Sequence, residues 1–120
     1  MYTQIQVGRA VGHHVYGNLY GCIEELLNNP EYLKNIVIEA VEIAGARLCH
    51  AESYSVNGYV AAIAIVMESH IAIHAWPEYG YAAVDVYTCG NTDPEAAFDF
   101  IVEKLKPKSY TKYFVDRSSN

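Results

Sequence analysis

Lysine and arginine are scarce in this chain: 8 of them stand against 14 aspartates and glutamates, so its 120 residues carry a formal net charge of −6. Proteins that bind nucleic-acid phosphates need clustered cations, and this balance therefore argues against a nucleic-acid partner. Long apolar runs are missing too. The longest, from Val60 to Met67, has the length of a strand and falls far short of the roughly 20 residues of a membrane span. We expect no membrane association.

Cysteine is also infrequent, and the three thiols are spread over the chain at Cys22, Cys49 and Cys89. An odd number of widely spaced cysteines favours reduced thiols over a disulfide framework, and no zinc-type spacing accompanies them. Residues 1–10 contain no long apolar segment of the kind found in leader peptides. We therefore expect a cytoplasmic protein without a bound metal.

Local signals divide the chain into strands and two main helices. The tripeptides Asn29-Pro30-Glu31 and Asp93-Pro94-Glu95 each combine a helix cap, a first-turn proline and a first-turn acid, and apolar residues then recur at helical spacing. Asn57-Gly58 is typical of a type I′ hairpin turn. We predict strands at 12–20, 47–56, 59–67, 70–76, 81–88 and 110–115, helices from 30 to Gly45 and from 94 to near Pro107, a helical turn at 23–27 and a loose tail at 116–120.

The order strand-helix-strand-strand-strand-strand-helix-strand predicts an α+β fold in one domain spanning residues 1–120. Both helices need an apolar surface to cover, which favours a two-layer α/β sandwich with an antiparallel or mixed sheet and the two main helices on one face. The other face of the sheet is then left bare. Because Val60 to Met67 is apolar on both sides of the strand, we expect that face to pack against a second copy in a homodimer.

The segment from Met67 to Gly90 gathers the side chains that could carry chemistry. Ser69, His74 and Cys89 would supply a nucleophile, a base and an acid, since imidazole titrates near neutrality and a hydroxyl needs an adjacent base. Ordinary strands explain the same residues, with Ser69 and Cys89 at strand ends and two histidines on one face. A metal site of His70, His74 and Cys89 is a weaker alternative, because no C-x-x-C or H-E-x-x-H spacing is present.

A long signature runs through this segment, in Glu68-Ser69-His70-Ile71, in the residues from His74 to Asp85 and in Thr88-Cys89-Gly90. It closely resembles the signature of the small prokaryotic S-adenosylmethionine decarboxylases, and the resemblance extends to the strand at 12–21 and the helix after Asp93. That family makes its own cofactor, a covalent pyruvoyl group, by cutting its own backbone. The resemblance therefore implies a carboxy-lyase of polyamine biosynthesis that is made as a zymogen and cleaves itself.

Carried over residue by residue, the resemblance implies that Ser69 attacks the carbonyl of Glu68 and turns the peptide bond into an ester, which is then eliminated. His74 would remove the α-proton of Ser69. The products would be a β chain of residues 1–68 and an α chain of residues 69–120 that begins with the pyruvoyl group. Substrate would form a Schiff base with that ketone, because amino-acid decarboxylation needs an imine to accept the electrons left by carbon dioxide.

The resemblance assigns three more residues to the substrate. Cys89 would return a proton to the carbanion, Glu78 would hold the ribose hydroxyls of a nucleoside, and Tyr54 would stack on its base. Aromatic faces also bind cations such as a sulfonium or a guanidinium. The tyrosines that could do so are Tyr16, Tyr20, Tyr54 and Tyr59.

Two features complicate this interpretation. Ser69 and His74 are five residues apart and would point to opposite faces of a regular strand, so we expect Ser69 in a turn or at a bulge. The family usually has a second serine eight positions before the cleaved one, where this chain has Ala61, which puts efficient processing in doubt. His13 and His14 acquire no role and are expected at the surface near a strand end.

The substrate is left open between two classes. The residues from Val15 to Tyr20 and from Asp116 to Ser119 resemble an archaeal branch that includes pyruvoyl-dependent arginine decarboxylases, whose product is agmatine. Residues Tyr79 to Ala83 look more like the members that use S-adenosylmethionine, which is our first choice. A third possibility is an uncleaved, non-catalytic partner of an active paralogue.

Overall fold

An antiparallel sheet of seven strands forms the frame of the chain, whose structure is described at residues 11–67 and 69–118 in this computed structural model. The strands are β1 (Gly12–Tyr20), β2 (Leu48–Val56), β3 (Tyr59–Val66), β4 (Ser69–Trp76), β5 (Tyr81–Cys89), β6 (Ser109–Tyr110) and β7 (Tyr113–Asp116). The helices are α2 (Glu24–Leu27), α3 (Pro30–Ala44) and α4 (Pro94–Leu105), with a 3-10 turn η1 (Pro77–Tyr79). The strand order is β2-β3-β4-β5-β1-β6, and β7 also pairs with β1.

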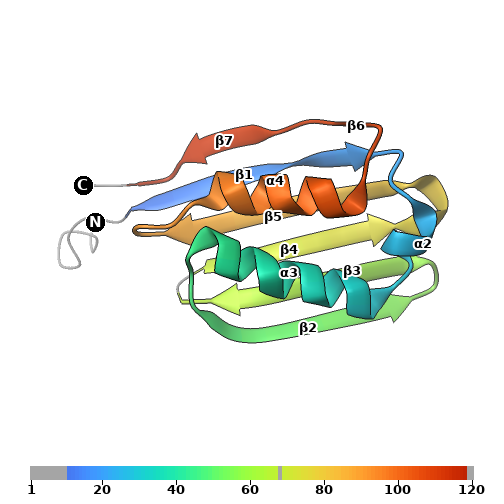
Figure 1. Cartoon of the computed structure of the whole chain (residues 1–120), viewed down its shortest axis with the longest axis horizontal. Coiled ribbons are helices and arrows are strands. Elements are labelled where there is room, and N and C mark those ends of the chain that lie inside the picture. Colours follow the sequence, from blue (N-terminus) through green and yellow to red (C-terminus); the bar gives the residue numbers. More distant parts are fainter. Residues whose placement is uncertain (1–10, 68, 119–120) are drawn as a thin grey trace, which may run out of the picture.

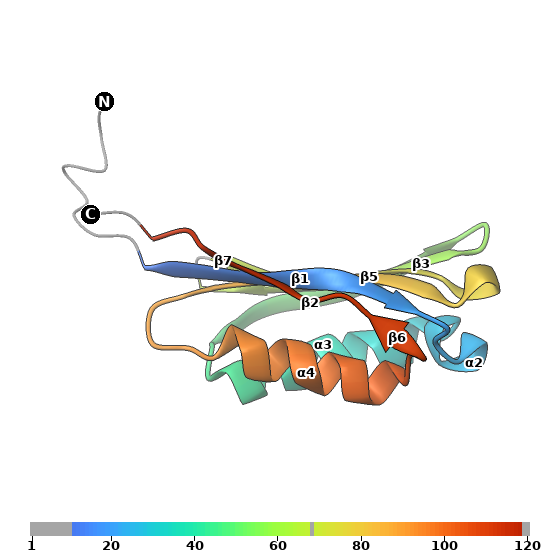
Figure 2. The ribbon, with the colours of Figure 1, turned by 90° about the horizontal axis from the view of Figure 1, so that it is seen from above.

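The helices cover one face of this sheet (Figures 1 and 2). Both long helices begin as predicted: the Asn29 side chain accepts a hydrogen bond from the Tyr32 amide at 3.0 Å, and Asp93 accepts one from the Ala96 amide at 3.1 Å. Gly45 ends α3 in the left-handed region at φ 77°, a conformation that costs glycine little. The predicted α+β sandwich is confirmed.

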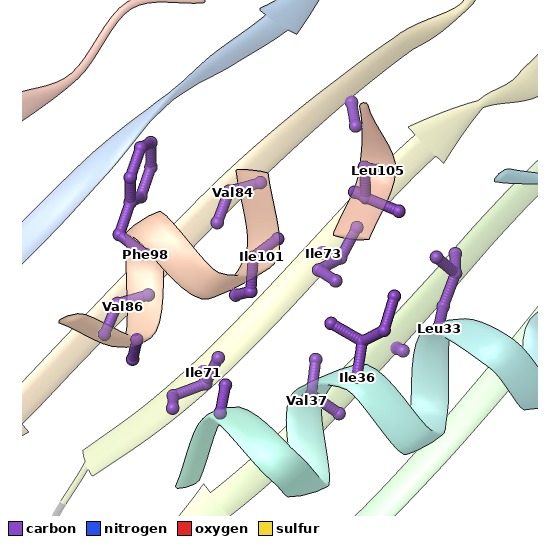
Figure 3. Packing of buried hydrophobic residues seen from close by; sticks show 14 of the residues in the cluster. Leu33, Ile36, Val37, Ile71, Ile73, Val84, Val86, Phe98, Ile101 and Leu105 are labelled. Atoms are coloured by element: carbon purple, nitrogen blue, oxygen red, sulfur yellow. The ribbon is translucent and has the colours of Figure 1, made fainter. Parts of the chain in front are cut away.

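The core lies between the sheet and the two long helices (Figure 3). Alternate residues of the central strands point into it, and each helix contributes the apolar stripe that its spacing predicts. Its largest fully buried side chains include Leu33 and Ile36 of α3, Ile71 and Ile73 of β4, and Phe98, Ile101 and Leu105 of α4. Burying one such side chain stabilises the fold by about 1.5–3 kcal/mol, so this layer fixes where the strands lie.

The hairpin between β2 and β3 also forms as predicted. Asn57 and Gly58 both have positive φ, at 49° and 80°, as a type I′ turn requires. The turn sets the register of the two strands, in which Tyr54 lies opposite Ala61.

The C-terminal part departs from the prediction in two ways. The single strand expected at 110–115 is divided into β6 and β7, because Thr111 leaves the regular ladder and its hydroxyl accepts a hydrogen bond from the Asn18 amide at 3.0 Å. Gly17 permits this close approach, since a Cβ there would lie 1.9 Å from the Thr111 carbonyl oxygen. The tail was expected to be loose from residue 116, but up to residue 118 it is held to β1: the Arg117 amide donates to the Gly12 carbonyl oxygen at 2.8 Å. Residues 119 and 120 lie outside the described residues.

No helix covers the opposite face of the sheet (Figure 2), and exposed apolar side chains lie on it. Ile63 and Ile65 of β3 are 39 % and 45 % exposed there, while their neighbours Ala62 and Ala64 are buried on the helix side. We call this surface the open face; it is the surface on which a second copy is expected. In the described part of the chain, no helix combines the length and apolar character needed to cross a membrane.

Candidate active site

Ser69 is the first residue of β4, at the hairpin end where β3 turns back. It pairs with Val66, and its hydroxyl donates to the Met67 carbonyl oxygen at 3.4 Å. Glu68, the other half of the expected cleavage site, lies outside the described residues. Pairing between β3 and β4 then runs without a shift from Ser69 to Ala75, so the expectation of a turn or bulge at Ser69 is wrong: Ser69 is the first residue of a regularly paired strand.

Cys89 is the last residue of β5, and the end of β5 lies at the same end of the sheet as the start of β4 (Figure 1), which is Ser69. His70 pairs with Tyr87, so the start of β4 and the end of β5 are side by side. A cavity of about 630 Å³ at this end is lined by both Cys89 and Met67. The structure thus brings the expected proton donor close to the start of β4, where the expected nucleophile lies.

Thr88 adds an unusual feature at this end. Its side chain is 1 % exposed, and its hydroxyl has no hydrogen-bond partner among the described residues. Leaving a buried hydroxyl unpaired costs about 1–3 kcal/mol. His70 pairs with Tyr87 in this antiparallel ladder. Thr88, which follows Tyr87, therefore lies opposite Ser69, which precedes His70. The fold therefore keeps an uncompensated polar group beside the expected nucleophile.

His74 and Tyr54 belong to a different part of the sheet. Tyr54 pairs with Ala61, which pairs with His74, so the three residues form one cross-strand row. Residues directly opposite one another point to the same face of a sheet, which here is the open face. Tyr54 is 63 % exposed, and His74 is exposed as well. Glu78 lies farther on, exposed in η1 beyond the last residue of β4.

The expected site residues therefore form two groups within one chain. Ser69 and Cys89 lie at one end of the central strands, whereas His74, Tyr54 and Glu78 lie toward the other end. A strand rises about 3.3 Å per residue, so about 16 Å of regular strand separates Ser69 from His74, which is too far for direct proton transfer. An open groove of about 670 Å³ runs between them and is lined by both residues.

A carboxylate bonded to two histidines borders this groove, whose lining includes Asp85 and His70. One oxygen of Asp85 lies 2.6 Å from His14 Nε2, and the other lies 2.6 Å from His70 Nε2. The hydrogen bond from His70, assisted by that from His14, lowers the pKa of Asp85 to about 2 against the opposing effect of burial. The prediction that His14 is a surface residue without a role is therefore wrong. Its side chain is only 21 % exposed and contacts Asp85 of β5.

Tyr87 connects this cluster to Cys89. Its ring contacts His14 edge-on at 5.8 Å and His70 at 6.0 Å, and the Arg117 guanidinium stacks on it at 4.3 Å. The Cys89 side chain, chiefly through a hydrogen bond, raises the pKa of the Tyr87 hydroxyl above its usual value. Sequence patterns could not reveal this group, because its members come from three strands whose pairing is set by the whole sheet.

The other two cysteines have no part in this arrangement. Burial raises the pKa of Cys22 to about 11, so this thiol remains protonated, and Cys49 is exposed on the edge strand β2. Among the described residues there is no disulfide, and no cluster of three or more potential metal ligands is present.

The lowered pKa of Asp85 leads to a prediction about acid stability. The folded pKa lies near 2 and the usual value near 3.8, so the ionised carboxylate stabilises the fold above pH 4 and this contribution is lost as the pH falls toward 2. We expect Asp85→Asn to lower the free energy of unfolding at pH 5 by about 1 kcal/mol, a figure reduced for solvent screening. Urea titrations between pH 5 and 2 should show the two proteins converging, and a gap that widens toward pH 2 would contradict this account.

Comparison with known proteins places the chain in a family. The family profile described as S-adenosylmethionine decarboxylase matches residues 13–118. The chain is 55 % identical to the arginine decarboxylase proenzyme of Hyperthermus butylicus, over 91 % of this chain and 80 % of the relative. It is 56 % identical to the S-adenosylmethionine decarboxylase proenzyme of Pyrobaculum islandicum, over 90 % of this chain and 89 % of the relative.

A solved structure agrees with these sequence matches. The crystal structure of the adenosylmethionine decarboxylase from Aquifex aeolicus superposes with a TM-score of 0.81 at 31 % identity, covering 90 % of this chain and 91 % of the other. The likeness in fold and the sequence match both extend over most of the chain. This protein belongs to the S-adenosylmethionine decarboxylase family, and it is a carboxy-lyase.

Proposed function

We propose that the chain is a self-processing, pyruvoyl-dependent decarboxylase of polyamine biosynthesis that acts on S-adenosylmethionine. The observation that carries the proposal is the position of Ser69 as the first residue of β4, directly after the β3–β4 connection, with Cys89 at the same end of the neighbouring strand β5. The word proenzyme in the names of both relatives supports processing of the chain. The single domain of residues 1–120 would then become a β chain of 1–68 and an α chain of 69–120.

Self-cleavage begins at the Ser69 hydroxyl and ends with a ketone in its place. The Ser69 hydroxyl oxygen attacks the carbonyl carbon of Glu68, the carbon–nitrogen bond breaks, and the hydroxyl proton passes to the released amine. A base, His74 of a second copy, then takes the α-proton of Ser69, and the Glu68 carboxylate leaves from the β-carbon. The dehydroalanine that results tautomerises to an imine, and water hydrolyses it with release of ammonia. The former Ser69 is now a ketone.

The residues around Ser69 fit a pyruvoyl group. Formation of the group breaks the peptide bond before the serine, so that serine must lie where a break leaves the core packed. Ser69 is at a strand end and only partly buried. The ketone supplies the electrophilic carbonyl for a substrate amine, which no standard side chain offers. The Cys89 thiol, at the same end, holds the proton that the substrate carbon receives.

A second copy is required for this chemistry. The 16 Å of strand between Ser69 and His74 prevents one chain from placing its base at its own nucleophile. A two-fold homodimer through the open face would cover Ile63 and Ile65 and could bring His74 of one copy to Ser69 of the other. The same arrangement would carry Tyr54 and Glu78, which lie toward the His74 end, to the substrate bound at Ser69.

Arginine is the second candidate substrate, because one of the two relatives reported above is named an arginine decarboxylase proenzyme. The assay is to incubate the purified protein separately with carboxyl-labelled S-adenosylmethionine and with carboxyl-labelled arginine, and to trap the labelled carbon dioxide. We expect release from S-adenosylmethionine. Release from arginine alone would replace the first choice by the second, and a chain that stays uncut and releases nothing would favour the non-catalytic partner.

A further inference from the structure

The neighbours of His74 on the open face are unusual for a residue expected to act as a base. On β3 the residue directly opposite is Ala61, and on β5 it is Ala83. Both neighbours in the row thus end in a methyl group and can form no hydrogen bond to the imidazole. A catalytic imidazole normally needs a partner on one ring nitrogen to fix its orientation and tautomer.

Tyr59 supplies that partner from the next row. Its hydroxyl lies 2.5 Å from His74 Nδ1, and the two rings are stacked with centroids 6.1 Å apart and an angle of 26°. In the described part of the chain this is the one hydrogen bond made by the His74 side chain, so Nε2 is left to receive a proton.

The Tyr59 ring is itself held in place. Trp76, two residues after His74 on the same face of β4, contacts it with centroids 5.2 Å apart, and Tyr81 contacts Trp76 at 5.2 Å. The Tyr81 hydroxyl in turn donates to Asn18 Oδ1 at 2.9 Å. A row of packed aromatic rings therefore fixes the hydroxyl that reaches His74.

We propose that Tyr59 is the positioning residue of self-cleavage, which holds His74 by its Nδ1 so that Nε2 can take the α-proton of Ser69. The inference rests on the proposed function. In the productive tautomer, His74 Nδ1 donates its proton to the Tyr59 oxygen. When Nε2 accepts the α-proton, that oxygen stabilises the imidazolium, and the Glu68 carboxylate departs from the β-carbon of Ser69.

Tyr59→Phe isolates the hydroxyl, because the ring and its contact with Trp76 remain. His74 acts after the ester has formed, so loss of its support should slow elimination but leave ester formation intact. We expect the variant to cut itself about tenfold more slowly and to accumulate ester, a fraction of the chain that hydroxylamine cuts at residue 68. A purely structural role for Tyr59 would slow both steps together and would leave no excess of ester.

Two further variants complete the test. Ala61→Ser places a hydroxyl directly opposite His74, and combined with Tyr59→Phe it should restore most of the rate. Tyr32→Phe is the matched control, since it removes a tyrosine hydroxyl bonded to the Lys104 carbonyl at 3.0 Å, in the helical layer, and should cut normally. Circular dichroism and thermal melting of each variant verify that it folds.

The outcomes separate this inference from the function on which it rests. If the unmodified chain never cuts itself, the proposed function fails. If the unmodified chain cuts and Tyr59→Phe cuts at the same rate without excess ester, the function stands and the role of Tyr59 is overturned. A slow Tyr59→Phe that Ala61→Ser leaves unchanged would also count against a hydroxyl supporting His74.

Discussion

Ser69→Ala should give a protein that remains a single chain of 120 residues after long incubation, whereas the unmodified chain should give fragments of 68 and 52 residues. The variant has no hydroxyl to attack the Glu68 carbonyl, so no ester can form and no later step can begin. Intact-mass spectrometry measures the result directly. A mass difference in the second fragment should also show that its first residue has lost ammonia and become a ketone.

The matched control is Ser109→Ala, which removes an exposed hydroxyl from β6, remote from the β3–β4 turn. It should cut at the normal rate. Because Ser69 is at a strand end and its hydroxyl makes only a long 3.4 Å hydrogen bond, Ser69→Ala should fold as well as the control. Cleavage of Ser69→Ala between residues 68 and 69 at an ordinary rate would remove the basis of the proposed function.

Mixing two inactive variants should restore cleavage. His74→Ala alone should stop at the ester, and Ser69→Ala alone should never reach it. In a mixed dimer, however, an intact Ser69 of one copy meets an intact His74 of the other. Only the His74→Ala chain can then be cut, and random pairing of equal amounts should cut up to about half of it.

This experiment tests whether His74 acts on Ser69 of the other copy, as the separation of about 16 Å along β4 requires. The two chains are best refolded together or produced together, with tags that give them different masses, and size-exclusion chromatography should show dimers. The double variant Ser69→Ala with His74→Ala, mixed with His74→Ala, is the control and should give no cleavage beyond the ester. If the mixed dimers form and stay uncut, or if His74→Ala completes the reaction alone, His74 does not act between copies.

Sequence patterns predicted those parts of the fold that depend on near neighbours. The caps at Asn29 and Asp93 and the turn at Asn57-Gly58 work through contacts of two or three residues, and all three formed as predicted. The alternation of side chains along a strand also predicted that His70 and His74 lie on one face of the sheet. The division of the last strand depends on the approach of Gly17 to Thr111, 94 residues later, and no local pattern contains that information.

The candidate site shows the same limit. The signature around Ser69 identified the family, but it could not show that the expected site residues separate into two groups, because this depends on which strand end each one occupies. Likewise His14 and Asp85 are 71 residues apart and meet only because β1 pairs with β5. The hydroxyl of Tyr59 reaches His74 across a β3–β4 pairing whose register is set by the turn at Met67.

The strand order has a consequence for the cut protein. β1, β2 and β3 precede the expected cleavage site and the other four strands follow it, yet the order in the sheet is β2-β3-β4-β5-β1-β6. β1 is therefore inserted between β5 on one side and β6 and β7 on the other (Figure 1). The two fragments cannot separate at a single boundary between strands, because β1 must first break its hydrogen bonds along both of its edges. Cleavage would remove a covalent bond from the enzyme without giving either piece a path to leave.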